Sequence, residues 1–216
     1  MTTVPLKPQY GPTLGQLLAP RWHAAGRMAR GTVIAAGSGL AVLAVAVVLT
    51  LLPATFSHGG AAPFGFSYRG LYRTAAAPGE LVRIERRSPG GELEDSFAVA
   101  PLRLPLYVGS VSGELPLYAS GYINELSRKY SGFLLRGEGK TRVNTVPAYN
   151  VLYTVLIKGR RLYGRDVLLL PERPGARDGV AIEMLSTTTS VKKIRTPLEV
   201  GVTGVLEEPL KTFTLG

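Results

Sequence analysis

The segment VPAYNVLYTVLI, residues 146–157, carries the strongest β-strand pattern in the chain. Side chains of a strand alternate between its two faces. One face here holds Tyr149, Val151, Tyr153, Val155 and Ile157, and the other holds Ala148, Leu152 and Leu156. Because both faces are largely apolar, the pattern predicts a central strand with packed layers on both sides and Leu152 in a core.

Strand patterns continue on either side of this segment. The chain turns at 158–160 into a second apolar run, and a loop at 171–179 leads to a third. Upstream, a Gly-rich turn at 88–91 joins two alternating segments. Short connections favour antiparallel neighbours, so we expect an antiparallel sheet. The expected strands lie at 81–87, 92–99, 146–157, 162–170 and 180–187.

Two helices are expected around the sheet. From about 116 to 130, an amphipathic aromatic face is formed by Tyr118, Tyr122, Ile123, Leu126 and Tyr130. The second pattern is a capping box, with Thr196 as N-cap, Pro197 in the first turn and Glu199 reaching back. This helix is expected to end at Pro209 and to bury Leu198, Val202, Val205 and Leu206.

The order of these elements, with VPAY at 146–149 and the closing KTF at 211–213, resembles the PsbP-like superfamily over about residues 116–216. Thr145 stands where that family's turn commonly has glycine. The resemblance implies an α+β fold, an antiparallel sheet sandwiched between helices as an α/β/α sandwich. It also implies non-enzymatic members that assist assembly of membrane complexes or bind other proteins, and it transfers no functional residue.

A second feature of the chain is a stretch without any Lys, Arg, Asp or Glu from Gly31 to Tyr68. Its apolar part runs from Thr32 to Leu52, and about 20 apolar residues suffice to cross a bilayer. A buried helix of a soluble protein would have a polar face, which this segment lacks. The sequence therefore predicts a single N-terminal transmembrane helix.

The charges that flank this segment predict its orientation. Residues 1–30 contain Lys7, Arg21, Arg27 and Arg30 and no acidic residue, whereas the following flank is neutral. The positive-inside rule then places the N-terminus in the cytoplasm and the C-terminal domain outside the cell membrane. The length of the leader and of the apolar run favours an uncleaved signal-anchor over a cleaved signal peptide. The expected parts are a cytoplasmic tail at 1–30, the transmembrane helix at 31–53, a linker at 54–63 and an extracytoplasmic domain at 64–216.

The residue types in the chain restrict the chemistry of this domain. There is no cysteine, and the two histidines, His23 and His58, both precede residue 64. This excludes thiol chemistry, a Ser-His-Asp triad and a Cys/His metal site in the domain. Glu92, Glu94 and Asp95 cluster without the spacing of a calcium loop, so we expect them to be solvated. We therefore predict no catalytic residue, metal or cofactor.

Basic residues remain as candidate binding residues, because the chain has a net charge of +10. Such runs fit an anionic lipid, an acidic polymer or an acidic partner, although they can also serve only to keep hairpin ends soluble. The outward topology disfavours nucleic acid. The predicted basic surface consists of Arg86, Arg87, Lys158, Arg160, Arg161 and Arg165.

Two functions remain open at this point. The first is a membrane-anchored binding or scaffold protein that supports a protein complex of the cell envelope and is not an enzyme. The alternative is a membrane-tethered hydrolase or transferase that uses carboxylates only, with Glu92, Glu94, Asp95 and Asp166 as candidates. Converging carboxylates in a deep cleft would favour the enzyme, and a shallow apolar or basic face would favour the scaffold.

Overall fold

The computed structural model describes residues 52–105, 111–173, 176–188, 190 and 193–216, together with Gly26, Thr32, Ala36 and residues 38–40. The predicted tail and most of the predicted transmembrane helix lie outside the described residues, although Thr32, Ala36 and residues 38–40 are helical. Within the described part of the chain, no helix has the length and apolar character needed to cross a membrane. The chain divides into two units, Met1–Thr50 and Leu51–Gly216.

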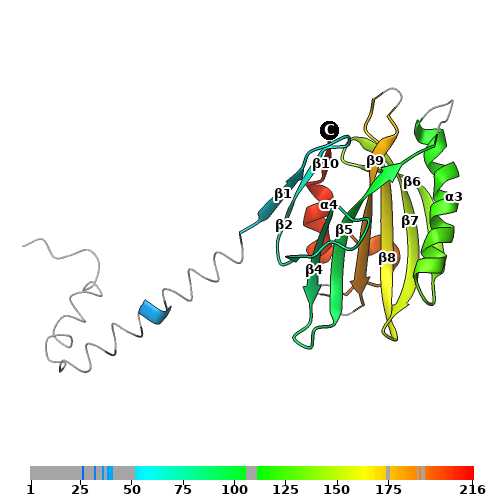
Figure 1. The fold of residues 1–216 in the computed structure, drawn as a ribbon. Helices are drawn as coiled ribbons and strands as arrows, with labels where there is room; N and C mark the ends of the chain where they lie inside the picture. The colour runs from blue at the N-terminus through cyan, green and yellow to red at the C-terminus, as the bar shows by residue number, and fades with distance from the viewer. Residues whose placement is uncertain are drawn as a thin grey trace, which may run out of the picture. The chain divides into compact units, whose positions relative to one another are not determined.

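The second unit is built on a seven-stranded antiparallel sheet with the order β3-β4-β5-β9-β8-β7-β6 (Figure 1). The predicted hairpin and meander are confirmed, because β4 pairs with β5, β7 pairs with β8, and β8 pairs with β9. The two groups of strands join where β9 pairs with β5. The strands are β3 (Tyr72–Thr74), β4 (Val82–Arg87), β5 (Leu93–Arg103), β6 (Leu134–Val143), β7 (Val146–Ile157), β8 (Arg160–Leu169) and β9 (Asp178–Thr187).

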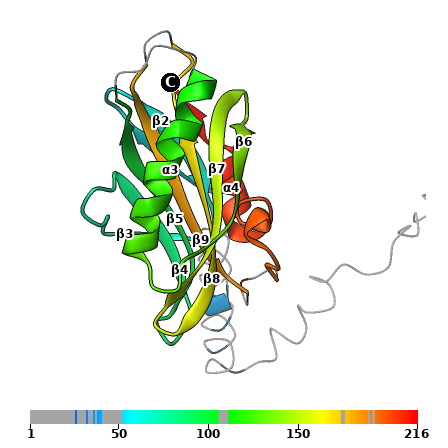
Figure 2. The same cartoon turned by 90° about the vertical axis from the view of Figure 1, so that its right-hand side faces the viewer.

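One face of this sheet is covered by helix α3, Val111–Lys129, which lies along β6 and β7 (Figure 2). The predicted helix is therefore confirmed, with a start five residues earlier than expected. Its buried face includes Leu115, Ala119 and Leu126, which join the apolar face of β7 in one core cluster. The predicted tyrosines Tyr118 and Tyr122 pack against the same cluster.

The opposite face of the sheet is covered by a second, three-stranded sheet and by short helices (Figure 1). The small sheet has the order β1-β2-β10, so the last strand of the chain pairs with a strand near the start of the unit. Its core is aromatic, and the ring of Phe66 lies 5.0 Å from that of Phe97. The elements are β1 (Ala54–His58), β2 (Phe64–Tyr68), η1 (Pro197–Glu199), η2 (Gly204–Leu206), α4 (Glu207–Lys211) and β10 (Thr214–Leu215).

These layers confirm an α+β fold with antiparallel sheets and correct the expected α/β/α sandwich, since only one long helix flanks the sheet in the described residues. The segment at 54–63 was predicted to be a linker, but it contains strand β1, which pairs with β2 from Ala54 to His58. Phe56 provides the reason, because its ring packs 5.6 Å from that of Phe66. The apolar alternation of a five-residue strand is too short to stand out in the sequence.

The predicted central position of β7 is wrong, because β7 is next to the edge strand β6 and the middle strand is β9. On the face of β7 beneath α3, Val151, Tyr153 and Val155 are fully buried and Ile157 is half-buried. On its other face, Ala148 is buried, Leu152 is half-buried and Leu156 is 42 % exposed. Thr154, between these two leucines, is 4 % exposed, so this face is covered unevenly and Leu152 does not lie in a core.

The predicted helix at 196–209 is also wrong. The backbone has positive φ at Gly201 and Gly204, which breaks the segment into η1, η2 and α4. Thr196 makes no side-chain capping bond, and Glu199 instead accepts a hydrogen bond from the Arg195 backbone N–H. The predicted buried stripe fails as a consequence: Leu206 is buried, but Leu198 and Val202 are 57 % and 53 % exposed.

Candidate functional site

The clearest candidate site is a concave pocket on the sheet face opposite α3, where three arginines surround an apolar and aromatic lining. Its volume is about 410 Å³, which is in the range of small-molecule sites. We call it the arginine pocket. Its lining residues are Arg136, Leu152, Arg161, Tyr163, Arg195, Thr196, Pro197 and Leu198.

Three separate segments bring the arginines of this pocket together. Arg136 is the extra residue of a β-bulge in β6, because Leu135 pairs with Tyr153 and Gly137 pairs with Leu152. A bulge redirects a side chain and is common beside functional sites. Arg161 and Tyr163 are two residues apart on β8 and therefore lie on the same face of the sheet. Arg195 comes from the segment that leads into η1.

These three guanidinium groups differ electrostatically from most other arginines of the sheet. Within the described residues, none of them has a carboxylate at ion-pair distance, and all three are exposed. Arg83 and Arg86, in contrast, are paired with carboxylates. Since no carboxylate lines the arginine pocket, its charge is available to a ligand. A guanidinium donates paired hydrogen bonds to a carboxylate or a phosphate.

The six predicted basic residues do not share one face of the sheet. Arg161 lies in the arginine pocket. Arg86 and Arg165 are on the same side of the sheet but do not line the arginine pocket: Arg86 pairs with Asp95 at 2.6 Å, and Arg165 is 7 % exposed. The remaining three, Arg87, Lys158 and Arg160, line a different pocket on the α3 side of the sheet.

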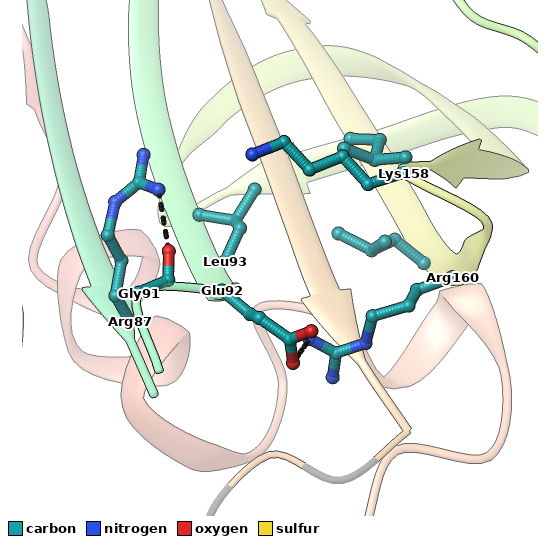
Figure 3. Close-up of a pocket in the computed structure, with 8 residues that line it drawn as sticks. Arg87, Gly91, Glu92, Leu93, Lys158 and Arg160 are labelled. Carbon is teal, nitrogen blue, oxygen red and sulfur yellow. Dashed lines mark hydrogen bonds and ion pairs between the residues drawn. The ribbon is translucent and has the colours of Figure 1, made fainter. Parts of the chain in front are cut away.

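This second pocket, of about 210 Å³, lies where the β4–β5 and β7–β8 hairpins end (Figure 3). Figure 3 shows that two of its three cationic side chains, Arg87 and Arg160, already interact with groups of the protein. Arg160 is paired with Glu92 at 2.5 Å. Arg87 donates to the Gly91 carbonyl at 3.1 Å and pairs with Glu85 at 2.6 Å. Lys158 is exposed, and no carboxylate lies within ion-pair distance of it in the described residues. The arginine pocket is therefore the better anion site.

Of the four candidate carboxylates of the enzyme hypothesis, Glu92 lines the second pocket, whereas Asp95 and Asp166 lie inside the fold. Asp166 is fully buried and accepts hydrogen bonds from Tyr122 at 2.8 Å and Tyr153 at 2.9 Å. Burial, and next the negative charge of Glu183, raise the pKa of Asp166 to about 8. Asp95 is 1 % exposed. Neither aspartate lines the arginine pocket or the second pocket.

Asp95 and its neighbours in the predicted acidic cluster are held by arginines and hydroxyl groups. Asp95 accepts hydrogen bonds from Arg86, Ser186 and Ser190, the last at 3.0 Å. Glu94 pairs with Arg86 at 3.1 Å. This cluster therefore fixes the β4–β5 hairpin and the segment after β9 to each other.

Sequence reasoning identified Arg161 but did not assign Arg136, Tyr163 or Arg195 to a site. Arg195 belonged to a basic run, 192–195, that could have been included. Arg136 stands in an RGEGK sequence that indicates a turn, whereas the structure places it in a strand. No local signal reveals the bulge, because it exists only through the pairing of β6 with β7.

Comparison with known proteins gives similarity in structure only. No protein-family description matches the sequence. No curated protein matches it either. The crystal structure of LpqN of Mycobacterium tuberculosis matches with a TM-score of 0.52 at 8 % identity, over 76 % of this chain and 91 % of LpqN. The solution structure of the cyanobacterial PsbP (CyanoP) of Synechocystis matches with a TM-score of 0.49 at 12 % identity, over 76 % and 92 %. The fold is thus shared with LpqN.

Proposed function

We propose that this chain is a membrane-anchored, extracytoplasmic scaffold protein of the cell envelope that binds an acidic partner protein through the arginine pocket. Its domain would belong to the PsbP-like superfamily, as the sequence resemblance over 116–216 implies. The observation that carries the proposal is the convergence of Arg136, Arg161 and Arg195 around one concave surface without a carboxylate partner. Like charges that converge in this way repel one another, and a bound anion removes the repulsion.

Binding is favoured over turnover by the state of the buried carboxylates. Asp95 and Asp166 are held by hydrogen bonds inside the fold, where they cannot meet a substrate. The arginine pocket offers charge and apolar contact, including Leu198, which is 57 % exposed. Arginine, tyrosine and exposed apolar groups are common in protein interfaces.

A role in the envelope is supported by two further observations. The apolar segment at 31–53 and its basic leader predict an anchor with the domain outside. LpqN, which shares the fold, is described as involved in cell envelope biogenesis. Fold alone does not carry function from one protein to another, so the pocket carries the proposal.

Site-specific photo-crosslinking in intact membranes of the source cells provides this test. A benzoylphenylalanine at Leu198 lies on the pocket rim, and one at Leu117, which is 65 % exposed on α3, serves as the control. We expect a defined adduct from position 198 only. Replacing Arg136, Arg161 and Arg195 together by glutamine should reduce this adduct at least tenfold, whereas Arg128→Gln on α3 should not.

The same adduct should weaken with salt, because the Debye length falls from about 10 Å at 0.1 M to about 3 Å at 1 M. An adduct from position 198 that persists at full strength in the triple variant would exclude the arginines from partner binding. Equal adducts from positions 198 and 117 would show that the pocket is not a preferred surface.

A further inference from the structure

Arg165 is a buried guanidinium whose charge is not balanced by the protein. Its side chain lies on β8, on the same face as the arginine pocket, and the residue is 7 % exposed. The Nη1 atom donates to the Val200 carbonyl at 3.2 Å, and the Nε atom is buried and has no hydrogen-bond acceptor in the described residues. Burial lowers the pKa of Arg165, and no carboxylate acts in the opposite direction.

Other arginines of the sheet show how the protein normally treats such a group. Arg83 is held by Glu80 and Glu85, and Arg86 is held by Asp95 and Glu94. Charged side chains are almost never fully buried unless they are paired, because desolvation of the charge is costly. A hydrogen bond to one backbone carbonyl could be made by a neutral side chain, so the bond to Val200 does not explain the positive charge.

Arg165 forms part of a shallow recess of about 330 Å³ between β8, the β6–β7 turn and the C-terminal helical segment. Two further cations, Arg142 and Lys211, line this recess, and both are exposed. Arg142 donates to the Thr145 carbonyl at 2.9 Å. Neither has a carboxylate at ion-pair distance in the described part of the chain. Glu207 is the one acidic residue in the lining, which leaves a net charge of +2.

We propose that this recess, which shares no residue with the arginine pocket, binds a phosphate group as a compact dianion, with Arg165 as its buried ligand. Two negative charges match the net charge of the lining. The guanidinium groups of Arg142 and Arg165 present planar donors suited to phosphate oxygens, and the Lys211 ammonium adds a point charge at the rim. The phosphate group is either free inorganic phosphate or part of a larger ester.

Thermal unfolding of the full chain in a nonionic detergent tests this site. Inorganic phosphate is compared with chloride at equal ionic strength, which removes general screening. At about ten times its Kd, a ligand that binds only the folded state should raise Tm by about 3–6 °C in a domain of this size. Glycerol phosphate forms a second arm: a larger shift than with inorganic phosphate identifies an ester as the source, and an equal or smaller shift identifies the free ion.

Variants connect this shift to the recess. Arg165→Met should abolish the phosphate-specific shift, and Arg128→Gln on the opposite side of the sheet should retain it. If Arg165→Met does not fold, the double replacement Arg142→Gln and Lys211→Gln, at two exposed positions, should reduce the shift by at least half. A phosphate effect no larger than that of chloride would overturn the proposal, as would a full shift in the Arg165 or rim variants. Neither result affects the arginine pocket, because its residues are different.

Discussion

Asp166→Asn should change how the stability of the domain depends on pH. Asp166 is fully buried beneath α3 and lies directly opposite Glu183 in the pairing of β8 with β9. Burial and the charge of Glu183 raise its pKa from 3.8 to about 8 in the folded protein. Well below pH 3.8 both the folded and the unfolded chain hold this proton, so the group does not reduce stability there.

Between pH 4 and 8 the unfolded chain releases this proton while the folded chain keeps it. Stability therefore falls as the pH rises through this window and levels off above it. A shift of about four pKa units corresponds to a free energy on the order of 5 kcal/mol. For a domain of this size, this amounts to a decrease in Tm of about 10–20 °C.

The asparagine variant removes the ionisable group and retains an amide oxygen that can accept a hydrogen bond from Tyr122 or Tyr153. We expect its Tm to be equal to or slightly below that of the wild type at pH 4 and clearly above it at pH 8. Circular dichroism melts of the full chain in nonionic detergent from pH 4 to 9 measure both. Asp178→Asn is the matched control, because the Asp178 side chain is 50 % exposed. Parallel curves for wild type and Asp166→Asn would refute the reasoning.

Two further predictions follow from the position of β7 and from the charges near the N-terminus. Val151→Asp, at a fully buried position, should lower the unfolding free energy by several kcal/mol. Leu152→Asp, at a half-buried position beside three arginines, should leave Tm within a few degrees of wild type. Urea and thermal melts of both variants measure these effects, and equal losses of stability would contradict the different burial of Val151 and Leu152. Single cysteines at Thr2 and Ser57 in this cysteine-free chain test the topology with an impermeant thiol reagent on whole cells. We expect labelling at Ser57 and not at Thr2, and the reverse pattern would contradict the predicted orientation.

Local sequence patterns were sufficient to predict the helices and strands whose signal lies in consecutive residues. The aromatic face of α3 and the alternation along β4, β5, β8 and β9 are properties of consecutive residues, and the structure confirms them. The composition likewise excluded cysteine chemistry. The expected absence of histidine from the domain was wrong, because His58 is the last residue of β1 and pairs with Phe64. The transmembrane helix and its orientation remain predictions of the same local kind, made from the apolar run at 31–53 and its flanking charges.

Local patterns failed where two distant segments decide the outcome. The capping box at Thr196 indicated one helix, but Gly201 and Gly204 adopt positive φ and direct the chain along the sheet. Strand β1 becomes a strand because β2 and the C-terminal β10 complete its small sheet. Leu152 and Val151 are equally apolar in sequence, yet Val151 is fully buried beneath α3 and Leu152 is only half-buried on the other side of β7.

The candidate sites depend on tertiary structure for the same reason. The amino-acid sequence by itself determined that the chain is basic and where the long helix and the strands β4, β5, β7, β8 and β9 lie, but it did not predict β6. That the apolar segment at 31–53 spans a membrane remains a prediction. Only tertiary structure decided which cations have partners: Arg160 meets Glu92 across two hairpins, whereas Arg136, Arg161 and Arg195 converge without an acid. A charge is neutralised by what lies next to it in space, and strand pairing places residues together that are tens of positions apart in the chain.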